Sequence, residues 1–368
     1  MCKPDARTGG LLMPASRFTQ TGNYRVRYQQ DQTIFATYAE QASLIVGVLL
    51  LLALPLLIPK TMLRDVDMIM IFAVAVLGLN VTTGYTGLIN IGQAAFMGVG
   101  AYATALAATR LNLPFFLAIP LGLAGALVGT FVGLPSLRLK YLYLAVATLA
   151  FQIIFEWTVG HSPVLAQGGA ISMPTVQIFG VRDTFLNHNM FWYYIILPVL
   201  VAMALLWRNV LRTRHGRAMI AVRDNDRAAA AMGINPGTAK LTAFMIGSFY
   251  AGIAGGLFAY FQKAVVIEDY GLHTSVQLLA MAIVGGLGSL PGSFLGPMFI
   301  VALDRFMGSA SAWLGEQDIF PQGIDVATAL RPLAFGLAIM LFLMFEPRGL
   351  ANWWRLVRMY FKKWPYKF

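Results

Sequence analysis

The sequence predicts an all-α fold, a polytopic transmembrane helix bundle of about ten spans with one polar helix between two of the spans. Apolar residue types make up 58% of the 368 residues and charged types only 12%, whereas an average soluble domain has about 25% charged residues. The apolar residues fall in runs of roughly 20, the length that crosses a bilayer as a helix. One polar run between two such runs, residues 208–240, carries a strong excess of arginine.

The first third of the chain predicts a tail followed by paired spans. Residues 1–41 are polar and contain no apolar run, so we expect a cytoplasmic tail there. The first span is expected at residues 42–59, with a short charged loop at 60–67. Residues 68–109 contain no charged residue and as one helix would be about twice as long as the ~30 Å hydrocarbon core is thick. The chain therefore has to turn, and the TTGYTG sequence at 82–87 is the expected place.

The remaining spans follow from the same reasoning. They are expected over residues 111–137, 141–159, 190–207, 241–262 and 330–345. A second uncharged run, residues 270–303, is again too long for one span, and GGLGSLPG at 285–292 supplies its turn. Glycines four residues apart permit close helix crossings. They are Gly125, Gly129 and Gly133, Gly252 and Gly256, and Gly292 and Gly296.

The distribution of positive charge predicts the orientation. With the N-terminus inside, alternation of the spans places most of the 27 lysines and arginines on the cytoplasmic side, as the positive-inside rule requires. We expect three parts: a tail at 1–41, a transmembrane domain at 42–347 that contains the loop 208–240, and a basic, aromatic cytoplasmic tail at 348–368. The loop 161–189 is then outside. Because the net charge of +11 follows the sides of the membrane, nucleic acid is not an expected partner.

The C-terminal tail has the composition of an anchor at the membrane surface. Aromatic residues alternate there with lysine and arginine, as in segments that lie at the lipid headgroups. Membrane lipid is therefore an expected partner of this segment. The aromatic residues are Trp353, Trp354, Tyr360 and Trp364.

The arginine-rich loop is expected to contain one continuous soluble helix. Residues 216–232 contain no proline and no internal glycine, and Ala228–Ala231 favour a helix. Gly233 and the NPG sequence at 235–237 end it. One interpretation is a loop whose arginines only fix the orientation. The other is a docking element for a cytoplasmic partner.

Catalytic and metal-binding motifs are absent from the sequence. There is one cysteine, the four histidines are scattered, and no phosphate loop, zinc motif or serine elbow occurs. We therefore expect no catalytic residue and no metal site. A membrane-embedded enzyme or scaffold is kept as one hypothesis, beside a transport function. A secondary carrier would need ionisable groups at membrane depth, and only Glu156 and Asp304, both near span ends, are candidates. If solute moves against a gradient, energy has to enter elsewhere, and the arginine-rich loop is the expected place.

The break in the first uncharged run is the candidate translocation path. Backbone that leaves the helix at membrane depth is tolerated only where protein buries it or where it faces a cavity. We expect the two amide side chains of this stretch to face the path near the midplane. The alternative is a structural kink whose polar side chains are satisfied. The candidate residues are Gly84, Tyr85, Gly87, Asn90, Gly92 and Gln93, with Gly285, Gly286 and Gly288 as a second bend.

Five segments, in this order and over nearly all of the chain after residue 65, together resemble a known family. That family is the LivM-type membrane permease subunits of branched-chain amino acid ABC transporters. The segments are GLNVTTGYTGLINIGQAAFMGVGAYA at 78–103, LRLKYLYLAVATLAF at 137–151, residues 215–261, VQLLAMAIVGGLGSLPGSFLGP at 276–297 and MLFLMFEPRGL at 340–350.

The resemblance implies partners and a location. It implies a permease subunit of the bacterial inner membrane that pairs with a second, LivH-like permease and docks two cytoplasmic ATPase subunits. A periplasmic solute-binding protein would deliver the solute and supply the selectivity. The chain itself would then be non-catalytic and hold no cofactor, with ATP and Mg on the partner subunits. The solute stays open between leucine-like amino acids, urea, amides and aromatic acids.

The resemblance also assigns the coupling residues. The family's docking motif, EAA-x-x-x-G, is matched by Ala228, Ala229 and Gly233, with Arg227 in the position of the glutamate. The other residues expected to couple to the ATPases are Arg217, Arg223, Asp224 and Asp226.

Overall fold

The computed structural model describes residues 51–118, 120, 123–134, 142–162, 170–178, 181–183, 187–315, 336–337, 339–342, 344 and 349–363. The chain divides into two units, Lys60–Val357 and Met1–Pro59 with Arg358–Phe368. The bundle and the candidate site lie in the first unit. The expected tail at 1–41 lies outside the described residues, and of the first expected span only residues 51–59 are described, with a helix over 51–57.

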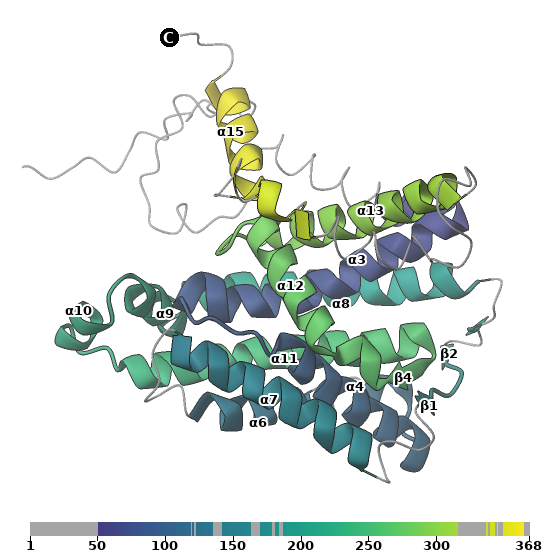
Figure 1. The fold of residues 1–368 in the computed structure, drawn as a ribbon, viewed down its shortest axis with the longest axis horizontal. Helices are drawn as coiled ribbons and strands as arrows, with labels where there is room; N and C mark the ends of the chain where they lie inside the picture. Colours follow the sequence, from purple (N-terminus) through teal and green to yellow (C-terminus); the bar gives the residue numbers. More distant parts are fainter. Residues whose placement is uncertain are drawn as a thin grey trace, which may run out of the picture. The chain divides into compact units, whose positions relative to one another are not determined.

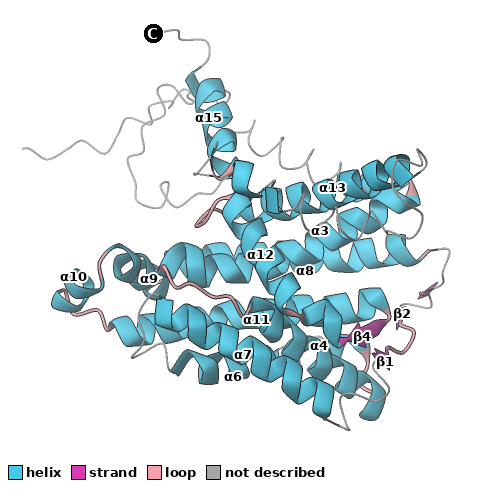
Figure 2. Ribbon diagram, in the orientation of Figure 1, coloured by secondary structure: helices cyan, strands magenta, loops and turns pink. Residues whose placement is uncertain are grey.

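The described part is almost entirely helical, which confirms the predicted fold class (Figure 2). Four of its helices are long and apolar enough to cross a membrane, and they begin at Lys60, Tyr143, His188 and Pro236. The helices are α3 (Lys60–Leu79), η1 (Asn80–Tyr85), α4 (Gln93–Arg110), α5 (Phe115–Ala118), α6 (Leu123–Gly133), α7 (Leu142–His161), α8 (His188–Arg212), α9 (Arg214–Asp224), α10 (Asp226–Ala231), α11 (Pro236–Gln262), η5 (Ile267–Tyr270), α12 (Leu272–Gly285), α13 (Leu290–Gly315) and α15 (Leu350–Lys363).

Helix α11 is the centre of the bundle. It contacts α3, α4 and α6, and every residue from Tyr250 to Phe261 is buried. Glycine allows these crossings: a methyl group added at Gly100 of α4 would lie 2.2 Å from the carbonyl oxygen of Gly252, and one added at Gly78 of α3 would lie 2.5 Å from that of Gly247. The expected role of closely spaced small residues in helix crossings is therefore confirmed.

Both long uncharged runs turn as expected, but the first turn is shifted: TTGYTG at 82–87 stays helical to Thr86, and the non-helical stretch runs from Gly87 to Gly92. Between α3 and α4 the chain leaves the helix at Gly87, and between α12 and α13 it does so at Gly286. The expected charged loop at 60–67 is wrong, because these residues form the first two turns of α3. Asp67 lies inside that helix and its side chain is fully buried. Sequence reasoning missed this because an acidic residue next to an apolar run is more often a flanking residue than part of the span.

Short strands close the end of the bundle opposite to α9 and α10, as Figure 1 shows. Strand β1 (Ala170–Ser172) pairs antiparallel with β4 (Ala264–Val266), and β2 (Gln177–Ile178) pairs with β3 (Val181–Arg182). Below we call the two ends of the bundle the α9–α10 end and the β-strand end. The expected polar loop at 161–189 thus contains the partner of a strand that follows α11, which ties the loop to the bundle.

A buried carboxylate holds the β-strand end together. Asp183 accepts hydrogen bonds from the indole nitrogen of Trp192 at 3.2 Å, contacts Nδ1 of His188 at 2.8 Å and pairs with Lys263 at 3.3 Å. Its side chain is only 2% exposed. Because three partners surround it, its burial is compensated in the way that buried charge requires.

Candidate functional site

The site is built around the break between α3 and α4. Helix α3 continues into a single turn of π-helix, η1, a rare form that is frequent at functional sites. The chain is then non-helical from Gly87 to Gly92. Gly87 has a φ of 70°, in the left-handed region that glycine adopts without strain. Non-helical backbone inside an apolar bundle requires hydrogen-bond partners from elsewhere in the protein.

Side chains from two other helices supply those partners. Threonine and glutamine side chains of α7 accept from the backbone amides of Ile91 and Ala95, and a serine of α12 accepts from that of Ala94, at 2.9 to 3.1 Å. The start of α4 is therefore capped within the bundle, where its free amides would otherwise be unsatisfied. Sequence reasoning missed these three residues, and the only signal for them was a polar side chain within an apolar run. They are Thr148, Gln152 and Ser275.

Asn90 and Gln93 hydrogen-bond to each other inside this break. Their side chains are 1% and 0% exposed, and the Asn90 amide donates to Oε1 of Gln93 at 2.8 Å. Gln93 also donates to the carbonyl oxygens of Ala75, at 3.2 Å, and Gly247, at 3.4 Å. Both amides therefore satisfy groups within this chain, as the kink interpretation requires. A role for them in translocation stays a prediction.

The two glycine-rich turns meet at the α9–α10 end. A methyl group added at Gly84 would lie 2.4 Å from the backbone nitrogen of Gly288. Asn80 joins the turns: its oxygen accepts from that same nitrogen at 3.1 Å, and its amide donates to the hydroxyl of Ser293 at 2.6 Å. Gly286 and Gly288 both have positive φ values, 111° and 75°. The two bends expected separately from the sequence are thus one junction, held by an asparagine that sequence reasoning did not select.

Arg223 of α9 reaches into this junction. Its guanidinium Nη1 donates to the carbonyl oxygen of Gly84 at 2.6 Å. A methyl group added at Gly87 would lie 3.3 Å from its Cγ, and one added at Gly288 would lie 3.2 Å from its Nη1. We call Asn80, Gly84, Arg223, Gly288 and Ser293 the arginine junction. It joins the arginine-rich loop directly to the break in the bundle.

Tyr85 and Trp207 lie beside this junction. Their rings make an edge-on contact with centroids 5.2 Å apart, so the end of η1 also packs against α8. Gly92 lies on the other side of the break, where an added methyl group would approach the carbonyl oxygen of Thr148 to 2.5 Å. Tyr85 and Gly92, two of the residues expected to line the path, are therefore in contact with neighbouring helices. Gly285 packs in the same way against Gly292, because a methyl group added at Gly285 would lie 2.0 Å from the carbonyl oxygen of Gly292.

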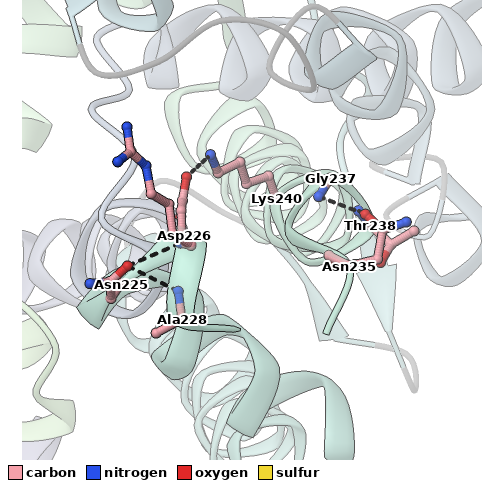
Figure 3. A network of polar contacts seen from close by, with 8 residues as sticks. Asn225, Asp226, Ala228, Asn235, Gly237, Thr238 and Lys240 are labelled. Atoms are coloured by element: carbon pink, nitrogen blue, oxygen red, sulfur yellow. Dashed lines mark hydrogen bonds and ion pairs between the residues drawn. The ribbon is translucent and has the colours of Figure 1, made fainter. Parts of the chain in front are cut away.

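The arginine-rich loop contains two short helices where one was expected. The prediction of one continuous helix is wrong, because Asn225 interrupts it and caps α10 by accepting from the amides of Arg227 and Ala228 at 3.0 and 3.1 Å (Figure 3). Asparagine is a strong N-cap, which explains the interruption. Asp224 and Asp226 therefore flank a break, where the sequence placed them in mid-helix.

Contacts within the chain fix the position of this pair of helices. Lys240 of α11 donates to Asp226 at 2.7 Å (Figure 3). Ala229 is buried against Val222 and Ala239. Arg217 donates to the carbonyl oxygen of Arg212 at 2.9 Å. The loop is therefore a folded lobe on the end of α11, which we call the α9–α10 lobe.

The tip of this lobe is exposed and apolar. Met232 is 85% exposed, and Ala228 next to the Asn225 cap is exposed as well. Gly233 has a φ of 84° with no atom within 4 Å of an added methyl group. An exposed methionine among small side chains is typical of a surface that packs against a partner.

Carboxylates inside the spans are few among the described residues. Glu156, near the end of α7, accepts from Gln152 at 2.9 Å, and Asp304 is an exposed residue of α13. Both lie toward the β-strand end. Asp67 is more deeply buried in the bundle than Glu156 and Asp304, and neither of its carboxylate oxygens has a hydrogen-bond partner. No group of three or more potential metal ligands occurs in the part of the chain that the structure describes.

Comparison with known proteins gives the family. A family model described as "Branched-chain amino acid transport system / permease component" matches residues 61–345. The chain is 31% identical over 295 residues to the high-affinity branched-chain amino acid transport system permease protein LivM of Escherichia coli and of Salmonella typhimurium, which covers 74% of this chain and 69% of each relative.

A shorter match extends to a second kind of permease. The chain is 30% identical over 146 residues to the corresponding LivH permease of Escherichia coli, covering 39% of this chain and 41% of that relative. No solved structure matches. The family match extends over most of the chain and includes both halves of the junction between the α9–α10 lobe and the helix break. The chain is a multi-pass membrane protein that belongs to the permease component family of branched-chain amino acid transport systems.

Proposed function

We propose that this chain is the membrane permease subunit of an ATP-binding-cassette importer for branched-chain amino acids or related small polar solutes. The observation that carries the proposal is the bond from Arg223 to Gly84. This bond connects the α9–α10 lobe, whose exposed tip is suited to a partner, with the break between α3 and α4. A push on the lobe would therefore act on the backbone of that break.

The proposal includes how energy enters. ATPase subunits that close on ATP would move the α9–α10 lobe through its exposed tip. The lobe is folded and capped, so displacement of the tip would carry Arg223 with it. The helix break is the element that can change, because its φ values rely on glycine. ATP and Mg would be bound by the partner subunits, and this chain would be a non-catalytic transport subunit without a cofactor of its own.

The partners and orientation are part of the same proposal. The relatives named LivM and LivH are two kinds of permease of one transport system, which supports a LivH-like second permease beside this chain. Two ATPase subunits at the lobe and a periplasmic binding protein at the β-strand end would complete the importer. We place the chain in the bacterial inner membrane, with the lobe and both termini in the cytoplasm. A cysteine placed at position 215 should then react only with a reagent that reaches the cytoplasm.

A second candidate function is favoured by one observation. Asp67 is a buried carboxylate without a hydrogen-bond partner, and an ionisable residue in a span is typical of ion-coupled carriers. Glu156 and Asp304 lie toward the β-strand end and are less suited to that role. A secondary carrier would take its energy from an ion gradient and would need no ATPase.

Uptake into proteoliposomes distinguishes the two functions. The chain is reconstituted with its candidate permease, ATPase and binding-protein partners, and uptake of labelled leucine is measured. If the chain is part of an importer, uptake requires ATP on the side of the vesicle membrane that holds the ATPase subunits. Uptake then continues when ionophores remove the proton and sodium gradients. Uptake without ATPases that ionophores abolish would establish the carrier instead.

A further inference from the structure

The β-strand end contains a cavity that the arginine junction does not use. It has a volume of about 560 Å³ and lies where α3, α11, α12 and α13 meet η5. Pockets for small ligands in proteins have volumes of about 300 to 1,000 Å³. The cavity is thus large enough for one small solute with some water.

The inner wall of the cavity is apolar. Met68 and Phe72 of α3 and Phe258 of α11 line it, and the two phenylalanine rings lie with centroids 5.9 Å apart at an angle of 34°. Phe72 and Phe258 are both buried, so a ligand would meet a fixed aromatic surface. Such a wall suits an aliphatic side chain, whose burial is favourable by the hydrophobic effect.

One side of the mouth carries negative charge without a partner. Glu268 and Asp269 of η5 line the cavity, and no hydrogen bond or ion pair is described for either carboxylate among the described residues. Burial and the neighbouring Glu268 raise the pKa of the Asp269 carboxyl above its usual value. A cation placed between Glu268 and Asp269 would lower the pKa of both carboxyl groups, since an opposite charge favours the ionised carboxylates.

Another part of the wall carries positive charge. Arg64 of α3 contacts only Oε1 of Gln262, at a long 3.5 Å, so most of its donors are unused among the described residues. Arg305 is different, because it is paired with Asp65 of α3. The cavity therefore offers the Arg64 guanidinium, the carboxylates of η5 and an apolar wall within one small volume, with Asp304 and the Arg305–Asp65 pair also in its lining.

We propose that this cavity is a solute-receiving site for a zwitterionic α-amino acid with an apolar side chain. The α-ammonium group would face Glu268 and Asp269, and the α-carboxylate would face Arg64. The side chain would lie on the wall formed by Met68, Phe72 and Phe258. A simple cation or anion would use only one of the two charged groups. The inference rests on the proposed function, because it takes the β-strand end as the side from which solute arrives.

Photolabelling tests the site directly. The full chain in lipid nanodiscs is incubated with the diazirine analogue of leucine and illuminated, and labelled peptides are identified by mass spectrometry. We expect labels between Met68 and Phe72 or at Phe258, and we expect excess unlabelled leucine to remove them. No labelling there, or labelling that leucine does not reduce, overturns the proposal.

Charge variants show which groups hold the solute. Glu268→Gln and Arg64→Gln should each lower the protected labelling at a given concentration roughly tenfold, as loss of a charge-assisted hydrogen bond does. Arg110→Gln removes a charge from the end of α4 outside the cavity and should leave labelling unchanged. Equal labelling in all three variants would overturn the assignment of the two charged groups.

Uptake separates this site from its alternatives. If Glu268→Gln weakens only the apparent affinity for the loaded binding protein while labelling persists, the carboxylates are a docking surface for that protein and the proposal is wrong. Protected labelling in a chain that shows no ATP-driven uptake would keep the site and reject the importer. ATP-driven uptake without labelling would keep the importer and reject the site.

Discussion

The guanidinium of Arg223 donates a 2.6 Å hydrogen bond to the backbone carbonyl oxygen of Gly84, 139 positions earlier in the chain. A backbone carbonyl at a helix break lacks its normal intrahelical donor, so a charged donor from outside the helix can hold it. Because Arg223 belongs to α9, the bond joins the α9–α10 lobe to the point where α3 ends.

Arg223→Gln should separate ATP hydrolysis from transport. A hydrogen bond from a charged group contributes about 1.5 to 3 kcal/mol, so its loss should lower the uptake rate roughly tenfold or more. ATP hydrolysis by the assembled complex should persist, because the tip of the lobe is unchanged. Uptake and hydrolysis are measured in the same proteoliposomes. Arg223→Lys should recover part of the uptake, whereas Arg214→Gln removes an exposed charge of the same helix and should transport several times faster than Arg223→Gln.

Equal uptake by Arg223→Gln and the wild type would show that the bond does not transmit motion. Parallel loss of hydrolysis and uptake would instead place Arg223 in the docking surface.

Gly233→Pro should prevent the ATPases from binding while the chain still inserts. Proline fixes φ near −65°, whereas Gly233 has a φ of 84°, so the end of α10 has to take another path. Nothing lies within 4 Å of an added methyl group, so the effect comes from the backbone and not from a clash. Co-purification of the ATPases is the measurement, with Gly233→Asn as the control because asparagine tolerates this region best after glycine. Co-purification of Gly233→Pro at the wild-type level would count against the docking role.

Asn80→Leu should destabilise the bundle by about 2 kcal/mol, because the part-buried Gly288 amide loses its acceptor and the buried Ser293 hydroxyl, which still donates to Ser289, loses the bond that it accepts from Asn80. Its side chain is fully buried and bonds both Gly288 and Ser293. Ser293→Ala combined with Asn80→Leu should cost less than the sum of the two single changes, as for residues in one network. Thermal unfolding in detergent measures all three variants. Additive costs would show that the Asn80–Ser293 bond contributes little.

Asp67→Leu should raise the unfolding temperature. The carboxylate is fully buried and has no hydrogen-bond partner. The change therefore removes an unsatisfied polar group, which should stabilise the folded state by about 1 to 3 kcal/mol. A lower unfolding temperature for Asp67→Leu, together with lost uptake, would show that Asp67 binds a ligand and would favour the secondary carrier.

Gln93→Leu and Asn90→Leu test the expected path. If the two amides only hold the kink, Gln93→Leu should lower stability by about 1 to 3 kcal/mol, since it removes bonds to Ala75, Gly247 and Asn90. The solute preference should then stay the same in the variants that fold. A changed ratio of leucine to valine uptake at saturating binding protein would place the amides in the path.

Local patterns in the sequence determined the class of the protein and the two breaks within its long uncharged runs. The two uncharged runs exceed the length of one span, which required the turns that the structure has near Gly87 and Gly286. The stop at Gly233 follows from the backbone preference of a single residue. The NPG sequence at 235–237 was expected only to end the preceding helix, whereas Asn235 caps α11, which therefore starts at Pro236 and not at residue 241. Closely spaced glycines predicted the helix crossings, because a small side chain is a local property that acts wherever two helices meet.

Only the tertiary structure decided which of these elements meet. Asn80, Thr148, Gln152, Ser275 and Ser293 are polar residues in apolar surroundings, and no local pattern relates a residue of η1 to one of α13. Asn225 interrupts the helix expected in the arginine-rich loop because its side chain caps α10. Asparagine can lie inside a helix or cap the start of one, and the alanine run that follows does not by itself decide between the two. The direction of Arg223 likewise depends on a carbonyl group 139 positions away. Hydrogen bonds between distant segments form only when the packing of the bundle has placed donor and acceptor within about 3 Å of each other.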